Sequence, residues 1–153
     1  MLKSSIFWFA FPGLLGLPAF GTVLFFQQVN YASLKGWDHL SMVKAYPLFT
    51  IVAVGISFLS GSLIDRYSAI KLIGIYQIPA ILGFYIFSVC ETLVGFSIGL
   101  ICFAITAGSN NIIPNAFWAE CFGTASLGKI KALAAGVMVV GSALGPLISG
   151  FLI

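Results

Sequence analysis

A largely apolar stretch contains several residues with hydrogen-bonding side chains, among them Thr106, Asn110, Asn111 and Asn115. Asn111 and Asn115 are four residues apart, as are Thr106 and Asn110, so each pair shares one face of a helix. Pro114 has no backbone N–H and leaves the carbonyl of Asn110 without its helical partner. Such amide and hydroxyl groups can bind a polar solute, or they can hydrogen-bond to neighbouring helices.

A second group of candidates lies in a short charged segment that contains Gly61, Asp65, Arg66 and Lys71. Asp65 can cap the start of the following helix, and Arg66 can pair with a carboxylate or with the carboxyl end of a helix. Gly61 has no side chain and allows two helices to approach closely. These contacts can form a gate that opens and closes, or they can belong to an ordinary charged turn, and the spacing favours neither interpretation.

Weaker candidates lie near the two ends of the chain. Gln27 and Gln28 can contribute to the same solute site, or they can simply lie at the end of an apolar segment. Gly141 and Gly145 fit the small-residue spacing with which helices pack closely in membranes. Pro146 follows directly and predicts a kink.

The sequence contains no constellation that is typical of an enzyme or a metal site. Cys90, Cys102 and Cys121 do not form a Cys-x-x-Cys pair, and His39 is the only histidine. There is no phosphate-binding glycine loop and no nucleophile elbow. We therefore expect no metal, no cofactor and no enzymatic activity.

The composition shows what kind of elements must position these residues. The 153 residues include only seven Lys or Arg and four Asp or Glu, whereas soluble domains carry about 25% charged residues. This excludes a soluble enzyme and a nucleic-acid-binding protein, so we expect no nucleic-acid partner. The charges leave five uncharged stretches, residues 4–34, 45–64, 72–90, 92–119 and 132–153.

Each stretch is close to or above the roughly 20 residues that a helix needs to cross a bilayer. Apolar residues are consecutive, as in Val137-Met138-Val139-Val140, whereas the strands of membrane barrels alternate. The sequence therefore predicts an all-α polytopic membrane protein with the lipid bilayer as its environment. We expect five transmembrane helices at about 5–29, 43–63, 71–90, 92–118 and 131–152.

The distribution of Lys and Arg predicts the orientation. One side of the expected bundle carries five basic residues and the other carries two, which places the amino terminus in the cytoplasm by the positive-inside rule. The loops 64–71 and 119–131 are then cytoplasmic, and the location is a plasma membrane, expected to be the bacterial inner membrane. The five basic residues are Lys3, Arg66, Lys71, Lys129 and Lys131, and the other two are Lys35 and Lys44.

The segment Gly61-Ser62-Leu63-Ile64-Asp65-Arg66, followed by Lys71, resembles the signature loop of the major facilitator superfamily. This chain departs from that pattern at Ser68, where the family usually has glycine, and at Ala69 and Ile70, where it has a basic pair. A second segment, Glu120-Cys121-Phe122-Gly123 with the following Leu127–Leu133, resembles the linker between the tenth and eleventh helices of the family.

This resemblance implies a partial half-bundle, helices seven to eleven of a twelve-helix transporter, so that the sequence is a fragment. The partners would then be the amino-terminal six-helix half, the last helix and a small-molecule solute. The expected function is transport of this solute by alternating access. In this interpretation Asp65 and Arg66 belong to the gate, and the asparagines line the cavity. The alternative is a membrane scaffold or assembly partner that transports nothing.

Overall fold

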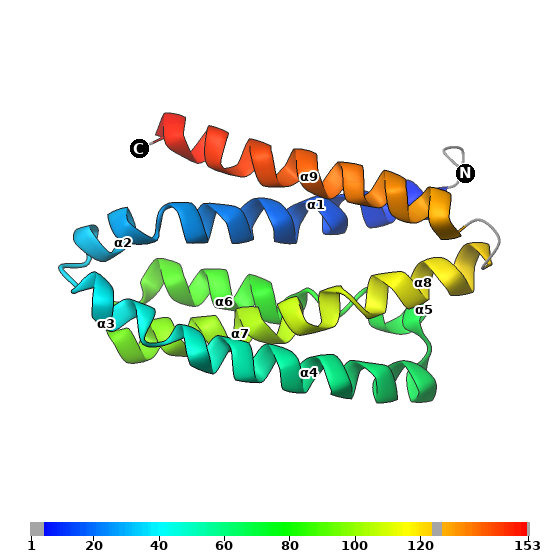
Figure 1. The fold of residues 1–153 in the computed structure, drawn as a ribbon, viewed down its shortest axis with the longest axis horizontal. Helices are drawn as coiled ribbons and strands as arrows, with labels where there is room; N and C mark the ends of the chain where they lie inside the picture. The colour runs from blue at the N-terminus through cyan, green and yellow to red at the C-terminus, as the bar shows by residue number, and fades with distance from the viewer. Residues whose placement is uncertain (1–4, 124–126, 153) are drawn as a thin grey trace. The chain divides into compact units, whose positions relative to one another are not determined.

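A computed structural model describes the backbone of residues 5–123 and 127–152, and the side chains of residues 13, 15–123 and 127–151. Lys3 and residues 124–126 of the predicted loop 119–131 lie outside these ranges. Within them the chain forms helices and no strands (Figure 1). The helices are α1 (Ser5–Phe26), α2 (Gln28–Leu34), α3 (His39–Val43), α4 (Tyr46–Tyr67), α5 (Ala69–Leu72), α6 (Ile78–Val89), α7 (Leu93–Asn110), α8 (Ile113–Phe122) and α9 (Leu127–Leu152).

Several of these helical segments are suited to a bilayer. Three are long and apolar enough to span it, namely His39–Tyr67, Leu93–Phe122 and Leu127–Phe151, and two shorter apolar helices cover Leu15–Phe26 and Ile78–Val89. Large apolar side chains also point outward, such as Phe58 at 78% exposure and Phe151 at 84%. Exposed apolar surface of this kind is stable only against lipid or protein. The prediction of an all-α membrane protein is therefore confirmed.

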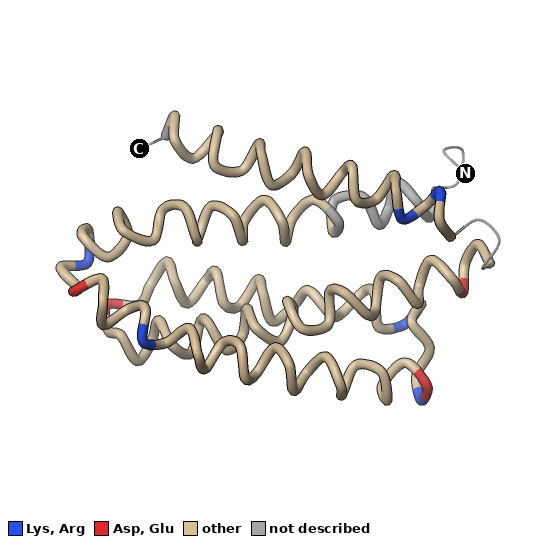
Figure 2. The backbone as a smooth tube through the Cα atoms, viewed as in Figure 1, with Lys and Arg blue, Asp and Glu red and all other residues tan. Residues whose placement is uncertain are grey.

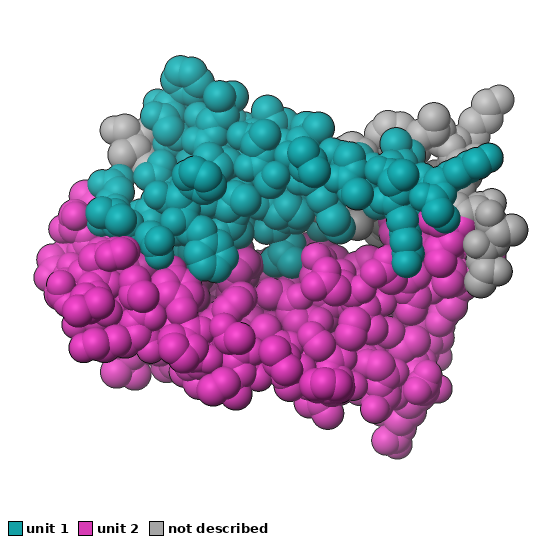
Figure 3. All heavy atoms as spheres, in the orientation of Figure 1, with its two compact units in different colours: residues 1–31, 128–153 teal, residues 32–127 magenta. Residues whose placement is uncertain are grey.

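The chain divides into two compact units (Figure 3). Unit 1 consists of residues 1–31 and 128–153, and unit 2 consists of residues 32–127. Each unit has its own contacts between helices.

In unit 1, α9 packs on α1 through small residues. A Cβ atom at Gly145 would overlap the backbone oxygen of Ala19, and one at Gly141 would lie 3.0 Å from the backbone oxygen of Leu15. The Thr22 hydroxyl lies 2.8 Å from the carbonyl oxygen of Pro18 in its own helix and 3.1 Å from that of Ser142 in α9, so it lies within hydrogen-bonding distance of both helices. Pro146 lies inside α9, which continues beyond it to Leu152.

In unit 2, α7 is the central helix and packs on both α4 and α6. On the α4 side, a Cβ at Gly108 would overlap the backbone oxygen of Ala53. The Ser57 hydroxyl lies 2.9 Å from the carbonyl oxygen of Gly108, and the hydroxyls of Ser60 and Ser109 are 3.0 Å apart. The two helices thus meet at a seam of small residues with hydrogen bonds across it, as is common in membranes.

The contact of α6 with α7 combines a glycine pair with aromatic rings. A Cβ at Gly83 would lie 2.8 Å from the backbone oxygen of Gly99. Beside this close approach the ring of Phe84 meets the ring of Phe103 edge to face, with 5.4 Å between the centroids. At the end of the unit, the indole N–H of Trp37 donates to the carbonyl oxygen of Glu91 at 3.3 Å.

Two stretches of unit 2 that were each predicted to be one continuous helix are interrupted. The stretch 71–90 is divided by a turn at residues 73–77, and the stretch 92–118 is divided at residues 111–112. In both cases a proline, Pro79 or Pro114, lies in the first turn of the following helix. Proline is tolerated there because the first N–H groups of a helix have no partner within it.

Charged residues of unit 2 lie at the ends of its helices (Figure 2). Lys35, Asp38, Lys44 and Glu91 precede or end helices at one end, and Asp65, Arg66, Lys71 and Glu120 lie in or beside the loops at the other. The middle of each of the longer helices α4, α6 and α7 is therefore free of charge, as a bilayer requires.

The α4–α7 seam makes a prediction about Gly108. Gly108→Ala should lower the free energy of unfolding by about 1–3 kcal/mol, because the added methyl group meets backbone that cannot rotate away. Gly55→Ala on α4 is the matched control, since its Cβ would meet nothing within 4 Å. Unfolding in mixed micelles titrated with SDS measures both. Equal stability of the two variants would show that α4 and α7 do not approach closely at Gly108.

Candidate functional site

Asn110 lies where α7 ends and belongs to a short chain of side-chain hydrogen bonds. Its Oδ1 accepts from the hydroxyl of Tyr76 at 3.3 Å, and the Nε2 of Gln77 donates to the same hydroxyl at 3.0 Å. Tyr76 is buried, and Asn110 and Gln77 are half-buried. These hydrogen bonds join the turn at residues 73–77 to the end of α7.

Asn111 and Asn115 lie at the break between α7 and α8. Both side chains are exposed in the described chain, and the Nδ2 of Asn115 donates to the backbone oxygen of Asn111. That oxygen lies at the break itself, so the Asn115 side chain supplies a donor where the helical pattern is interrupted. The Oδ1 of Asn115 and the side-chain amide of Asn111 remain on the surface of unit 2.

Thr106 differs from the asparagines, because it is fully buried. Its hydroxyl accepts from the N–H of Ala80 at 2.9 Å and donates to the carbonyl oxygen of Tyr76 at 3.1 Å. Both hydrogen-bonding functions are thus used within the protein. The geometry does not support Thr106 as a cavity-lining residue, since a solute would have to displace two backbone contacts to reach it.

Gln27 and Gln28 belong to unit 1, whereas the asparagines belong to unit 2. Gln27 lies between α1 and α2, and its Nε2 donates to the Ser149 hydroxyl of α9 at 3.4 Å. Both glutamines are half-buried. Both glutamines lie toward one end of the α1–α9 pair, past the contacts that Gly141 and Gly145 make with α1.

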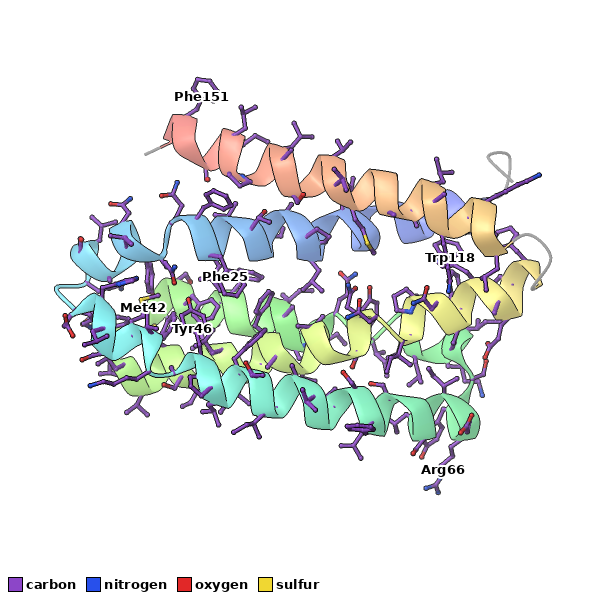
Figure 4. All side chains as sticks on the ribbon, in the orientation of Figure 1. Phe25, Met42, Tyr46, Arg66, Trp118 and Phe151 are labelled. Carbon is purple, nitrogen blue, oxygen red and sulfur yellow. The ribbon has the colours of Figure 1, made fainter. Side chains whose placement is uncertain are left out.

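The charged segment at the end of α4 is exposed. Asp65, Arg66 and Lys71 all have exposed side chains, and Arg66 extends away from α4 with its guanidinium 5.4 Å from the centroid of the Tyr67 ring (Figure 4). A Cβ at Gly61 would meet no atom within 4 Å, so the expected close approach of helices is not found within the described residues. Asp65 lies inside the last turn of α4 and does not cap the following helix, contrary to prediction.

Glu120 of α8 is the residue that caps α5. Its carboxylate accepts from the Ser68 hydroxyl at 2.6 Å, from the N–H of Ala69 at 2.9 Å and from the N–H of Ile70 at 3.3 Å. A carboxylate satisfies the free N–H groups at the start of a helix and complements its dipole. Glu120 therefore connects the two segments that carry the family resemblance.

Ser68 has an unusual backbone conformation, with φ 69° and ψ 142°. Glycine adopts this region freely, whereas a residue with a side chain does so at a cost of about 1–3 kcal/mol. This explains in physical terms why the family pattern has glycine here. In this chain the hydroxyl contact with Glu120 offsets part of the strain.

The sequence did not reveal Glu120 as a cap, nor Tyr76 and Gln77 as partners of Asn110. A signal for the turn was present, because Gly74 lies in it, Pro79 follows it, and both weaken a helix. No local signal places Tyr76 against Asn110 or Glu120 against Ser68, since these partners are far apart in the sequence. Within the described residues, no group of three or more His, Cys, Asp or Glu could hold a metal ion.

The described geometry defines a class of protein, an integral membrane protein of helices with polar side chains at its helix breaks. Over residues 1–153 the chain matches the family model of the Major Facilitator Superfamily. Comparisons with curated proteins and with solved structures found no match. The chain belongs to the major facilitator superfamily, a family of membrane transporters, and the resemblance noted in its sequence is confirmed.

Two substitutions at Ser68 separate the backbone strain from the hydroxyl contact. Ser68→Ala and Ser68→Gly both remove the hydroxyl that donates to Glu120, but only glycine relieves the positive φ. We expect Ser68→Gly to be more stable than Ser68→Ala by about 1–3 kcal/mol, measured as the difference in unfolding free energy. If the alanine variant were equally stable, the backbone at this position would not be strained.

Proposed function

We propose that this chain moves a small polar solute across the membrane by alternating access. The observation that carries the proposal is the break between α7 and α8, where Asn110, Asn111 and Asn115 gather in a largely apolar helical stretch. Transporters bind their solutes near the middle of the membrane, often where helices are interrupted. Family membership supports transport in general, and the position of the asparagines supports this site.

The asparagines can serve the solute in different ways. Asn111 and Asn115 expose amide groups that both donate and accept hydrogen bonds. Asn110 has its oxygen engaged by Tyr76, so its Nδ2 is the atom that it offers. Such groups suit an uncharged or a charged solute, and the proposal covers both. No described residue makes a catalytic cluster with them, and we propose transport without an enzymatic step.

The cytoplasmic gate in this proposal includes Asp65 and Arg66, together with the contact of Glu120 at the start of α5. Asp65 and Arg66 lie in the last turn of α4, two or three residues before Ser68. Their charges are exposed and can pair with another part of the transporter when it changes state. The Glu120 contact holds α5 to α8, so that a force on the charged segment also reaches α8.

The remaining assignments are part of the same proposal. The amino terminus lies in the cytoplasm, the membrane is the bacterial inner membrane, and the complete transporter includes a further six-helix half and a last helix. Gln27 and Gln28 of unit 1 remain candidate solute-binding residues. No Asp, Glu, Lys, Arg or His lies in the middle of a predicted span, so an ion-coupling charge belongs to the other half.

Cysteine accessibility tests the site without knowledge of the solute. In the full-length protein, with Cys90, Cys102 and Cys121 replaced by alanine, single cysteines are placed at Asn111 and Asn115. A charged, membrane-impermeant thiol reagent should modify both in intact membranes, because the solute path admits water. Ile81→Cys on α6 is the control, since Ile81 is an apolar side chain at 66% exposure that should face lipid.

The same experiment distinguishes a transporter from a scaffold. Rapid modification at positions 111 and 115 with protection at 81 supports the water-filled path. Protection at all three positions would instead place the asparagines in a dry contact between helices, and the proposal would be wrong.

A further inference from the structure

The helical hydrogen-bond pattern at the start of α6 is interrupted by a side chain from α7. In a continuous α-helix the N–H of Ala80 would donate to the carbonyl oxygen of Tyr76, four residues earlier. Here the Thr106 hydroxyl lies between the two groups, 2.9 Å from the nitrogen of Ala80 and 3.1 Å from the oxygen of Tyr76. A hydroxyl inserted in this way is one of the recognised causes of a helix kink.

The neighbouring position removes a second helical hydrogen bond. Pro79 has no N–H, so the carbonyl oxygen of Ile75 cannot pair with it and instead accepts from the N–H of Ile78 at 3.1 Å. Three consecutive hydrogen bonds of the α-helical pattern are thus missing: the N–H of Ile78 donates to Ile75, Pro79 has no N–H, and the N–H of Ala80 donates to Thr106. Thr106 is 0% exposed, so its hydroxyl occupies this gap from within the protein.

The open turn determines where the Tyr76 hydroxyl lies. A phenol has one hydrogen to donate, and the Gln77 amide nitrogen can only donate, so Tyr76 accepts from Gln77 and gives its hydrogen to Asn110. This fixes Oδ1 of Asn110 as the acceptor and leaves Nδ2 directed away from Tyr76. No partner of this Nδ2 is found within the described residues.

We propose that Thr106 and Tyr76 are positioning residues for the candidate solute site. The Thr106 hydroxyl keeps the chain open between α5 and α6, and the open turn holds the Tyr76 hydroxyl on Asn110, which orients the Asn110 amide. The two positioning residues act through Asn110, so their role in transport depends on the proposed function. The arrangement itself belongs to unit 2 and can be tested without a solute.

The first test measures whether the Thr106 hydroxyl holds the turn open. Spin labels are attached at Ile70 on α5 and Tyr85 on α6, both exposed, in the full-length protein. In Thr106→Ala the N–H of Ala80 can pair directly with Tyr76, so the bend should decrease in part, with Pro79 still in place, and the distance between the labels should lengthen. Thr106→Ser retains the hydroxyl and should reproduce the wild-type distance.

An unchanged distance in Thr106→Ala would overturn this part of the proposal. So would a Thr106→Ser variant that differs from wild type as much as the alanine variant, because the effect would then come from the lost methyl group.

The second test follows the Asn110 amide itself, and it does not depend on the folding of the Thr106 variants. In protein labelled with ¹⁵N-asparagine, the side-chain peaks of Asn110 are identified as those lost in Asn110→Ala. Tyr76→Phe should shift both peaks, because Oδ1 loses its donor. Tyr85→Phe is the matched control, since Tyr85 is 65% exposed and lies on the same helix bundle.

Peaks of Asn110 that stay in place in Tyr76→Phe would overturn the positioning role of Tyr76. Neither test uses a solute, so their failure is distinct from failure of the proposed function, which the accessibility of positions 111 and 115 decides. If both tests succeed but cysteines at positions 111 and 115 are protected from the reagent, the Asn110 amide is positioned within a dry contact between helices.

Discussion

The constraint on which this structure depends is that every backbone N–H and C=O inside a membrane needs a partner from the protein, because hydrocarbon supplies none. An uninterrupted helix meets this requirement automatically, but unit 2 contains two interrupted stretches. At each interruption a side chain supplies the missing contact: Thr106 reaches the backbone of Tyr76 and Ala80, and Asn115 reaches the backbone of Asn111. The candidate solute-binding residues therefore fall into two groups. Some stabilise the backbone at the breaks, and others keep polar atoms there that can bind a solute.

Much of the fold follows from the sequence, because its causes are local or compositional. The scarcity of charge defines the membrane class, the runs of consecutive apolar residues define helices, and Pro114 indicates an interruption beside the asparagines. The four-residue spacing of Gly141 and Gly145 indicates close helix packing, and both glycines lie against α1 in unit 1. Each of these features can be found within a window of a few turns.

The remaining features depend on partners that are distant in the sequence. The capping of α5 was predicted for Asp65, which is nearby, yet the cap comes from Glu120, which is about fifty residues away. Thr106 seemed to belong with Asn110 because both share a helix face, but burial against the turn at residues 73–77 gives it a different task. Spacing identifies which face of a helix a residue occupies, and only the packing of that helix determines what the face meets.

The inserted hydroxyl at Thr106 has a consequence for how relatives of this chain can diverge. A proline at position 79 and a hydroxyl at position 106 serve the same turn, although one acts through the backbone of its own helix and the other from a neighbouring helix. A relative with an ordinary residue at 79 would recover one backbone hydrogen bond and depend less on a hydroxyl at 106, and its helix would be straighter. Positions 79 and 106 should accordingly change together across the family, and the pair would mark which members retain the bend.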